Sequence, residues 1–258
     1  MRNSEYLYQY TSLETLAIIL KEKKIKFSKL NSLDDPLEKY IGFICIPNSR
    51  FHITNNVGDF CFVSCWSKNK NESIAMWDMY GDRKKGVRIG LPADMLDPNY
   101  IINDNKKMCQ HRLFECEEPI KKPPELIKIS YNRTSDPVII DKDLNLDLDS
   151  LGRYKIKDWE FQEEYRFRIF AEYDERIKAN SYLFSSELTY NNFSFEKPIS
   201  ESYLLYGIKS SVMSKIKIII GPDMPKGKRY LLESLIKDYE IDRRRVRNSK
   251  FTDPLFVL

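Results

Sequence analysis

The stretch Lys157–Phe170, KDWEFQEEYRFRIF, constrains the fold more than any other part of this sequence. The two-residue period of an extended chain predicts a strand here, with one face made of Phe161, Glu163, Tyr165, Phe167 and Ile169. The opposite face then carries Gln162, Glu164, Arg166, Arg168 and Phe170. A half-exposed strand with a solvated ladder of charges fits this pattern. A strand whose Glu164 points into a cleft and does chemistry there fits it as well, and this stretch leaves both interpretations open.

The composition is that of an ordinary globular protein, with 42% hydrophobic and 31% charged residues among 258. Apolar runs such as LAIIL are too short to span a bilayer, and the N-terminus lacks the apolar core of a signal peptide. Five cysteines without a CxxC pair favour reduced thiols over a disulfide framework. We therefore expect a cytoplasmic protein without membrane association. A formal net charge of +4 is weak evidence for a polyanionic partner.

Short strand-like and helix-like segments alternate along the chain. Strands are predicted at EYLYQY, IKFS, DFCFVSCW, KGVRIGL, LIKISYN and IKIIIGPDM, and helices at TSLETLAIILKEKK, NESIAMWDMY and KGKRYLLESLIKDY. Thr11 and Glu14 have the spacing of a capping box at the start of the first helix. Its buried stripe is predicted to consist of Leu13, Leu16, Ala17 and Leu20.

No repeat and no clear linker divides the chain. We therefore predict a single α+β domain over residues 1–258, with mixed or antiparallel sheets and flanking helices. The core of this domain is expected at about 6–222, followed by a C-terminal helix and an edge-like strand within 226–258.

Two charged segments resemble binding sites, one for calcium and one for phosphate groups, but the sequence of each argues against that function. Asp141–Asp149 has alternating acidic residues but lacks the glycine and the final carboxylate of a calcium loop, so no metal site is predicted. Asp242–Arg247, DRRRVR, is a basic cluster without an interleaved aromatic platform, which favours a solvated edge strand. His52 and His111 have no companion motif for a catalytic triad.

Aromatic side chains recur in the same elements as polar ones. Core packing explains most such stripes, but a pocket for a planar ring and a ribose needs this same mixture of flat walls and hydrogen-bonding groups. The residues that combine these properties are Tyr8, Gln9, Tyr10, Thr11, Ser64, Trp77 and Tyr80.

Several blocks in a fixed order resemble a bacterial family of unknown function, number 2971. They are LYQYTSLETLAIILKEKKIKFS, NSLDDPLE, FCFVSCW, AMWDMYGDRKKGVRIGL, KISY, KDWEFQEEYRF and IIIG. The resemblance runs from about residue 6 to 222 and implies family membership. It implies no activity, because the family is defined without one.

A more distant resemblance is to the ADP-ribosyltransferase superfamily, whose members open with a similar aromatic-x-Tyr-Thr strand and helix. The resemblance implies an ADP-ribosyltransferase-like fold, NAD as substrate, and Glu164 as the catalytic glutamate on a late strand. Gln9 replaces the usual basic residue of that superfamily, so it can hydrogen-bond a ribose but carries no charge. Arg166 is expected either to bind the pyrophosphate or to pair with Glu164, and Glu163 is the weaker catalytic candidate.

These observations favour an NAD-dependent ADP-ribosyltransferase-like protein that modifies a nucleic acid or a protein, or an NAD glycohydrolase. The resemblance also suggests a bacterial toxin or phage-defence effector. The alternative is a non-catalytic module that binds a nucleotide or a protein on the same fold. The sequence leaves open which is correct, and the scarcity of histidine argues against an unrelated hydrolase or nuclease.

Overall fold

The computed structural model describes residues 5–35, 38, 43–45, 52–100, 108–110, 124–131, 151–173 and 198–253. Its helices are α1 (Leu13–Glu22), α3 (Ile74–Tyr80), α4 (Ser210–Met213) and α5 (Lys226–Asp238). Short 3₁₀ helices are η1 (Leu30–Ser32), η2 (Val57–Asp59), η3 (Lys157–Gln162) and η5 (Arg243–Arg245). The strands are β1 (Tyr6–Thr11), β2 (Lys24–Lys29), β3 (Phe43–Cys45), β4 (His52–Asn56), β5 (Cys61–Ser67), β6 (Val87–Pro92), β7 (Met108–Gln110), β8 (Glu125–Lys128), β9 (Glu164–Tyr173), β10 (Tyr203–Gly207), β11 (Lys217–Ile220) and β12 (Val246–Asn248).

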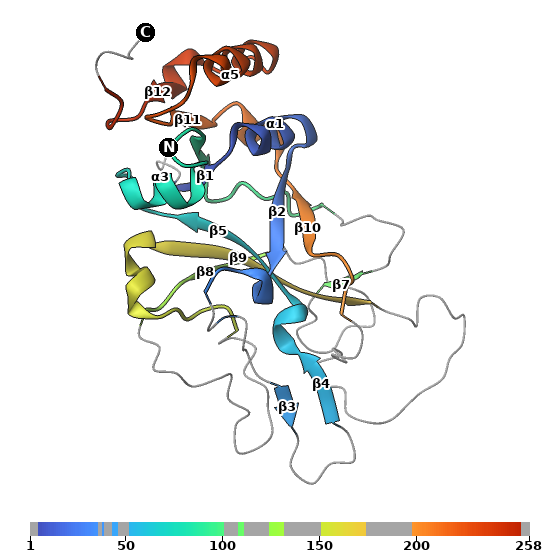
Figure 1. Cartoon of the computed structure of the whole chain (residues 1–258). Coiled ribbons are helices and arrows are strands. Elements are labelled where there is room, and N and C mark those ends of the chain that lie inside the picture. The colour runs from blue at the N-terminus through green and yellow to red at the C-terminus, as the bar shows by residue number, and fades with distance from the viewer. Residues whose placement is uncertain are drawn as a thin grey trace.

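Ten of these strands form one sheet, in which β5 is the branching point (Figure 1). One edge of β5 pairs with β9 along its whole length, from Cys61 to Ser67. The other edge is shared: β2 pairs near the start of β5, and β1 pairs at Tyr8↔Ser67 near its end. Beyond β1 follow β6, β11 and β12, and beyond β2 follows β10. The sheet therefore forks at β5, and α1 connects the two branches.

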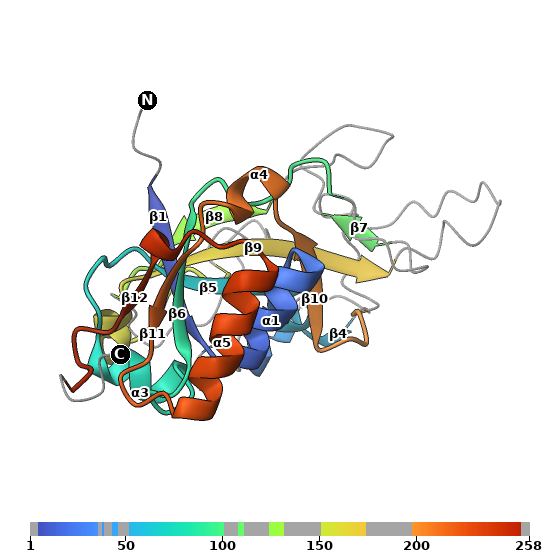
Figure 2. The same cartoon turned by 90° about the horizontal axis from the view of Figure 1, so that it is seen from above.

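Helices cover both faces of the sheet. Helices α1 and α5 lie side by side on one face (Figure 2), and their buried leucines and isoleucines join the main hydrophobic core. On the opposite face α3 contacts β1, where Trp77 packs against Tyr10. Since β11 and β12 pair in parallel and the other pairs are antiparallel, the sheet is mixed. The predicted α+β class with a mixed sheet and flanking helices is confirmed.

Helix α1 begins one residue later than the capping box predicts. Ser12 is the N-cap, and its hydroxyl accepts a hydrogen bond from the Thr15 amide at 3.1 Å. Thr11 is instead the last residue of β1. The predicted apolar stripe is correct at its three leucines, which are at most 3% exposed, while Ala17 is half-buried. Helix α3 starts after a Ser73 cap, inside the predicted segment NESIAMWDMY, and its C-cap is Gly81.

The prediction for Lys157–Phe170 is wrong at its beginning. Phe161 and Gln162 belong to the 3₁₀ helix η3, and Glu163 has a left-handed backbone with φ of 44°, so strand alternation starts only at Glu164. The solvated charge ladder is also wrong, because Glu164, Arg166 and Arg168 are each at most 4% exposed.

The basic C-terminal segment forms less strand than predicted. Arg243–Arg245 make the 3₁₀ turn η5, and only Val246–Asn248 pair with β11. The proposed domain boundaries stay a prediction. Asp141–Asp149 and His111 lie outside the described residues. None of the helices in the described ranges is both long and apolar enough to cross a membrane.

The core analysis predicts a sharp contrast between two neighbours on α1. Leu16→Ala should lower the free energy of unfolding by about 2–5 kcal/mol, because Leu16 is 0% exposed and its removal leaves a cavity. Ile18→Ala is the matched control: Ile18 is 53% exposed, and the expected change is about 0.5 kcal/mol or less. Urea denaturation measures both, and equal losses would contradict the burial assigned to this helix.

Candidate functional site

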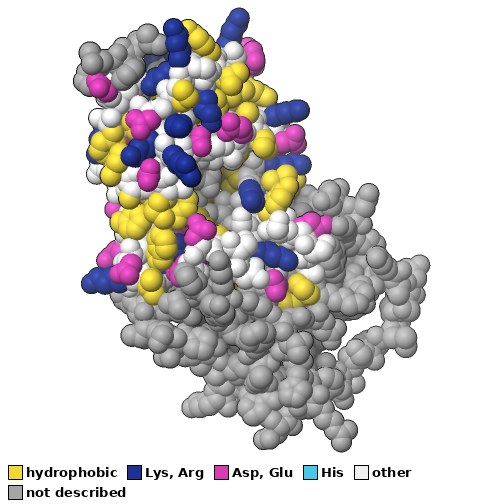
Figure 3. All heavy atoms as spheres, viewed as in Figure 1, with side chains coloured by type: hydrophobic (Ala, Val, Ile, Leu, Met, Phe, Trp, Pro, Cys, Tyr) yellow, Lys and Arg dark blue, Asp and Glu magenta, His cyan; other side chains and the backbone are white. Residues whose placement is uncertain are grey.

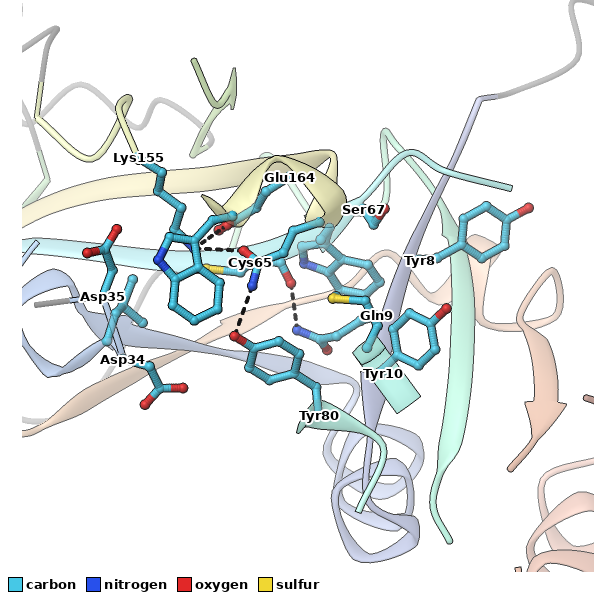
Figure 4. Close-up of a pocket in the computed structure, with 15 residues that line it drawn as sticks. Tyr8, Gln9, Tyr10, Asp34, Asp35, Cys65, Ser67, Tyr80, Lys155 and Glu164 are labelled. Atoms are coloured by element: carbon cyan, nitrogen blue, oxygen red, sulfur yellow. Dashed lines mark hydrogen bonds and ion pairs between the residues drawn. The ribbon is translucent and has the colours of Figure 1, made fainter. Parts of the chain in front are cut away.

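A pocket of about 170 Å³ opens where the sheet forks (Figure 4). Strands β1 and β5, helices α3 and η3, and the loop after η1 all contribute to its walls. The lining residues are Tyr8, Gln9, Tyr10, Leu33, Asp34, Asp35, Cys65, Trp66, Ser67, Met76, Tyr80, Lys155, Trp159, Gln162 and Glu164. Five segments far apart in the sequence therefore meet at one cavity.

Gln9 occupies the gap between the diverging strands β1 and β5. These strands share a single register pair, Tyr8↔Ser67, and then separate. The Gln9 side chain turns into this gap, and its Nε2 donates a hydrogen bond to the Cys65 carbonyl at 3.0 Å. A side-chain amide thus satisfies a backbone acceptor that the strand ladder no longer reaches. The fork creates the pocket, and Gln9 stabilises its inner edge.

Glu164, the first residue of β9, contributes a buried carboxylate to the pocket wall. Its Oε1 accepts a hydrogen bond from Arg166 Nε at 2.5 Å, and its Oε2 lies 2.6 Å from Lys155 Nζ. The backbone amide of Glu164 donates to the Tyr131 hydroxyl at 2.7 Å. The Oε2 of Glu164 is buried and lies against the Lys155 ammonium. The carboxylate is thus fixed in position.

Two opposing effects set the pKa of Glu164. Burial alone would raise it, because an apolar environment disfavours the charged carboxylate. The cations of Arg166 and Lys155, together with the hydrogen bond from Arg166, outweigh burial and hold the pKa at about 2. Glu164 is therefore ionised at neutral pH and is suited to stabilise positive charge rather than to donate a proton.

Arg166 anchors Glu164 from behind the pocket wall. Its guanidinium is 0% exposed and donates to Glu164, to both carboxylate oxygens of Glu38 and to the Gly152 carbonyl. Burial raises the pKa of Glu38, and the Arg166 charge opposes that increase. The cluster is closed on itself, so Arg166 holds the carboxylate and does not line the cavity.

The aromatic wall of the pocket is braced by side chains beneath it. The ring of Tyr10 meets Trp77 edge to face at 4.9 Å, and its hydroxyl accepts a hydrogen bond from the Ser73 amide at 2.9 Å. Trp77 is 0% exposed, and its indole NH donates to Glu72 at 3.1 Å. Trp77 therefore supports Tyr10 from the core and offers no surface for a ligand.

Arg88 lies beneath the neighbouring tyrosines. Its guanidinium carbon is 4.2 Å from the ring centre of Tyr8 and 5.1 Å from that of Tyr10. The guanidinium also donates to the carbonyls of Asn69 and Lys70, which fixes the loop after β5. Burial lowers the pKa of Arg88 against the raising effect of Tyr10 and Tyr8. A cation therefore lies over one face of each ring.

The structure gathers five of the nine predicted site residues at the pocket. These are Tyr8, Gln9, Tyr10, Tyr80 and Glu164. The other four do not line it: Thr11 is buried at the end of β1, Ser64 accepts from the Trp66 indole at 3.1 Å, and Trp77 and Arg166 support the wall from behind. Strand β5 supplies Cys65, Trp66 and Ser67 to the lining, and Ser64 is not among them. Glu163 is exposed and accepts a hydrogen bond from Asn69 at 2.5 Å.

Several lining residues were missed by the sequence analysis. Lys155 and Gln162 hydrogen-bond each other at 2.9 Å, and Gln162 in turn donates to the Tyr80 hydroxyl at 3.0 Å. Asp34 and Asp35 face this group across the cavity (Figure 4). Asp34 and Asp35 entered the sequence analysis only within the block NSLDDPLE, and nothing in the local pattern marked Lys155.

Helix α3 contributes Met76 and Tyr80 to the pocket, and η3 contributes Trp159 and Gln162. Burial raises the pKa of Tyr80 to about 12, so its hydroxyl stays protonated there at neutral pH. The two helices also carry exposed apolar side chains, and Figure 3 shows hydrophobic groups at the surface of the molecule. These side chains are Ile74, Met79 and Phe161. Among the described residues, no cluster of three or more His, Cys, Asp or Glu side chains is placed to hold a metal ion.

No protein-family model matches the chain, and no curated protein matches it in sequence. The resemblance to family 2971 therefore stays a prediction. Among solved structures, the chain is similar to DarT from Thermus sp. 2.9 in complex with carba-NAD+. The two share 9% identity over 97% of this chain and 98% of that chain, with a TM-score of 0.33. A similarity at this level carries no inference about function.

The electrostatics of Glu164 predict a specific dependence of stability on pH. Its folded-state pKa of about 2 lies below the ordinary value of 4.5, so its ion pairs stabilise the fold fully above pH 4.5. This contribution is lost as the pH falls toward 2. Wild type should therefore lose about 3 kcal/mol of unfolding free energy relative to Glu164→Gln between those pH values. Urea denaturation at a series of pH values measures the difference, and a constant difference would contradict the depressed pKa.

Proposed function

We propose that this protein binds NAD at the fork pocket and cleaves its nicotinamide–ribose bond, transferring ADP-ribose to a macromolecule or to water. One observation carries the proposal: a fixed, ionised carboxylate, Glu164, stands on the wall of a small pocket that also contains tyrosine rings. Breaking that bond builds positive charge on the ribose carbon. A carboxylate held in place beside this carbon stabilises the transition state.

The dimensions of the pocket fit one end of the dinucleotide. A volume of about 170 Å³ is below the roughly 300–1,000 Å³ of pockets that enclose a whole drug-sized ligand. The cavity therefore suits a nicotinamide ring and part of its ribose, with the rest of the molecule outside. Tyr8, Tyr10 and Tyr80 supply aromatic walls for the ring.

The proposed reaction is balanced without a metal or an oxidant. The C–N bond between nicotinamide and ribose breaks, and its electron pair leaves with the nicotinamide nitrogen. A nucleophilic oxygen or nitrogen of the acceptor, or of water, forms the new bond to the same carbon and loses a proton. Glu164 stays ionised throughout, and Arg166 with Lys155 keeps it in place.

A non-catalytic binding module is the second candidate, and two features favour it. Gln9 is neutral, and its amide is already used to bridge the Cys65 carbonyl. Glu164 is also held tightly by two cations. A protein that senses a nucleotide needs the pocket, but it does not need a carboxylate that can move with the ribose carbon during a reaction.

The decisive experiment compares Glu164→Gln with Glu163→Gln in the purified protein. Each change removes one carboxylate at adjacent positions, but Glu163 lies outside the pocket lining. We expect wild type and Glu163→Gln to release nicotinamide from NAD in the presence of cell lysate. Release by Glu164→Gln should be about 100-fold slower or more, because the electrostatic stabilisation is lost.

A thermal shift with NAD separates binding from turnover in the same variants. Saturable stabilisation by NAD without nicotinamide release from wild type would establish the binding module instead. Equal release rates from both glutamate variants would remove Glu164 from the mechanism. Glu164→Asp serves as a second variant, because it keeps the charge and moves it by one methylene.

A role as a bacterial toxin or defence effector predicts an effect on growth. Overexpression of wild type should arrest growth of the host, because NAD or an essential macromolecule is consumed. Glu164→Gln should relieve the arrest at an equal protein level, verified by immunoblot, whereas Glu163→Gln should not. Arrest by all three proteins would indicate a cause other than Glu164 chemistry.

A further inference from the structure

A second hollow, of about 580 Å³, lies on the same face of the sheet and shares Tyr8 with the fork pocket. It is formed by the first three residues of β11, the segment from Asp242 to β12, and the loop after β5. The lining residues are Tyr8, Lys70, Lys217, Ile218, Ile219, Asp242, Arg244, Arg245 and Arg247. Five cations and one carboxylate thus surround it, in a chain whose formal net charge is only +4.

These cations are only partly neutralised by their neighbours. Arg244 forms a bidentate pair with Asp242, and Arg247 lies 3.4 Å from Glu72. Among the described residues, Lys70 and Lys217 form no ion pair. Burial lowers the pKa of Lys217, and the charges of Arg245, Lys70 and Arg247 lower it further. Like charges gathered around one hollow repel one another, and a bound anion relieves this repulsion.

Aromatic rings border the same hollow. Tyr6 and Tyr8 stack with ring centres 6.4 Å apart, and Lys217 Nζ lies 3.7 Å from the centre of the Tyr6 ring. Phosphate-binding cations beside aromatic rings are the combination by which proteins hold single-stranded nucleic acid. The sequence of the basic segment lacks such rings because they come from β1, at the other end of the chain.

One row of register pairs connects this hollow to the fork pocket. Glu164 pairs with Ser67, Ser67 with Tyr8, Tyr8 with Gly90, and Gly90 with Lys217. Directly opposed residues point to the same face, so the carboxylate and the ammonium lie on one side of the sheet. Four strand spacings of about 4.8 Å place their backbones roughly 19 Å apart.

This separation bears on which phosphate the hollow holds. A ribose that lies against Glu164 is joined to its own phosphate by a few covalent bonds. The distance between that ribose and its phosphate is therefore much shorter than the distance from Glu164 to Lys217. The phosphates of a longer chain cover that span. An acidic peptide supplies charge but no bases to lie against the tyrosine rings.

We infer that the hollow of Lys70, Lys217, Arg244, Arg245 and Arg247 binds the phosphodiester backbone of a single-stranded nucleic acid, which is the acceptor presented to the fork pocket. This inference rests on the proposed function, because it names the acceptor class of the same site. Binding of the strand itself does not depend on NAD or on Glu164.

The test is binding of a fluorescein-labelled single-stranded DNA of about 20 nucleotides, followed by anisotropy without NAD. Lys70→Gln/Lys217→Gln should weaken binding roughly tenfold or more at 0.1 M salt. The slope of log K against log salt concentration should be less steep by about 1.4 for this variant than for wild type, because each lost phosphate contact reduces the slope by about 0.7. Lys21→Gln/Lys237→Gln makes the same charge change on α1 and α5, which cover the opposite face, and should bind like wild type.

The outcomes separate this inference from the proposed function. DNA binding that depends on Lys70 and Lys217 supports the inference even where no NAD is consumed. Equal weakening by both double variants would overturn it, since only overall charge would then matter. The inference would also be overturned if Lys70→Gln/Lys217→Gln lost the NAD-induced thermal shift but bound DNA like wild type. The hollow would then hold the pyrophosphate of NAD itself. Competition by polyglutamate equal to that of unlabelled DNA at matched ionic strength would overturn it in favour of an acidic peptide.

Discussion

The buried ion cluster around Arg166 is the interaction on which the site depends. One guanidinium joins the start of β9, Glu38 and the backbone at Gly152, and Lys155 closes the cluster from the pocket side. Burying such charges is costly unless every partner is satisfied, so removing one member affects all the segments it joins. The cluster therefore contributes position more than stability. It holds the Glu164 carboxylate at the cavity wall, in a position that the surrounding loops alone would not fix.

The fork at β5 provides the space that this carboxylate faces. A continuous sheet would pair every backbone group of β5 and leave no opening between β1 and β2. Because β1 separates from β5 after one register pair, a side chain replaces a missing backbone hydrogen bond. Gln9 Nε2 donates to the Cys65 carbonyl. The same amide that a ligand-binding interpretation would assign to a ribose thus already has a structural partner.

Local pattern predicted much of the fold and five of the fifteen residues that line the pocket. The α1 stripe and the alternation of β9 from Glu164 onward follow from the periods of helix and strand. The left-handed residue Glu163 was not predictable, because nothing in EFQEEY marks where alternation begins. Trp77 and Tyr80 look equivalent in a helical pattern, yet one is buried against Tyr10 and the other lines the pocket. Lys155 was missed because its role arises from a contact with Glu164 across a loop, which no spacing encodes.

Tyr8 is the one side chain that belongs to both hollows, and it rests directly on Gly90, where an added Cβ would lie 2.8 Å from the ring. The ring has no room to move toward the sheet, and the Arg88 guanidinium lies over one of its faces. A ligand in one hollow that shifts this ring would change the wall of the other hollow, and any effect it has on the affinity of a second ligand is then matched by an equal effect of the second on the first.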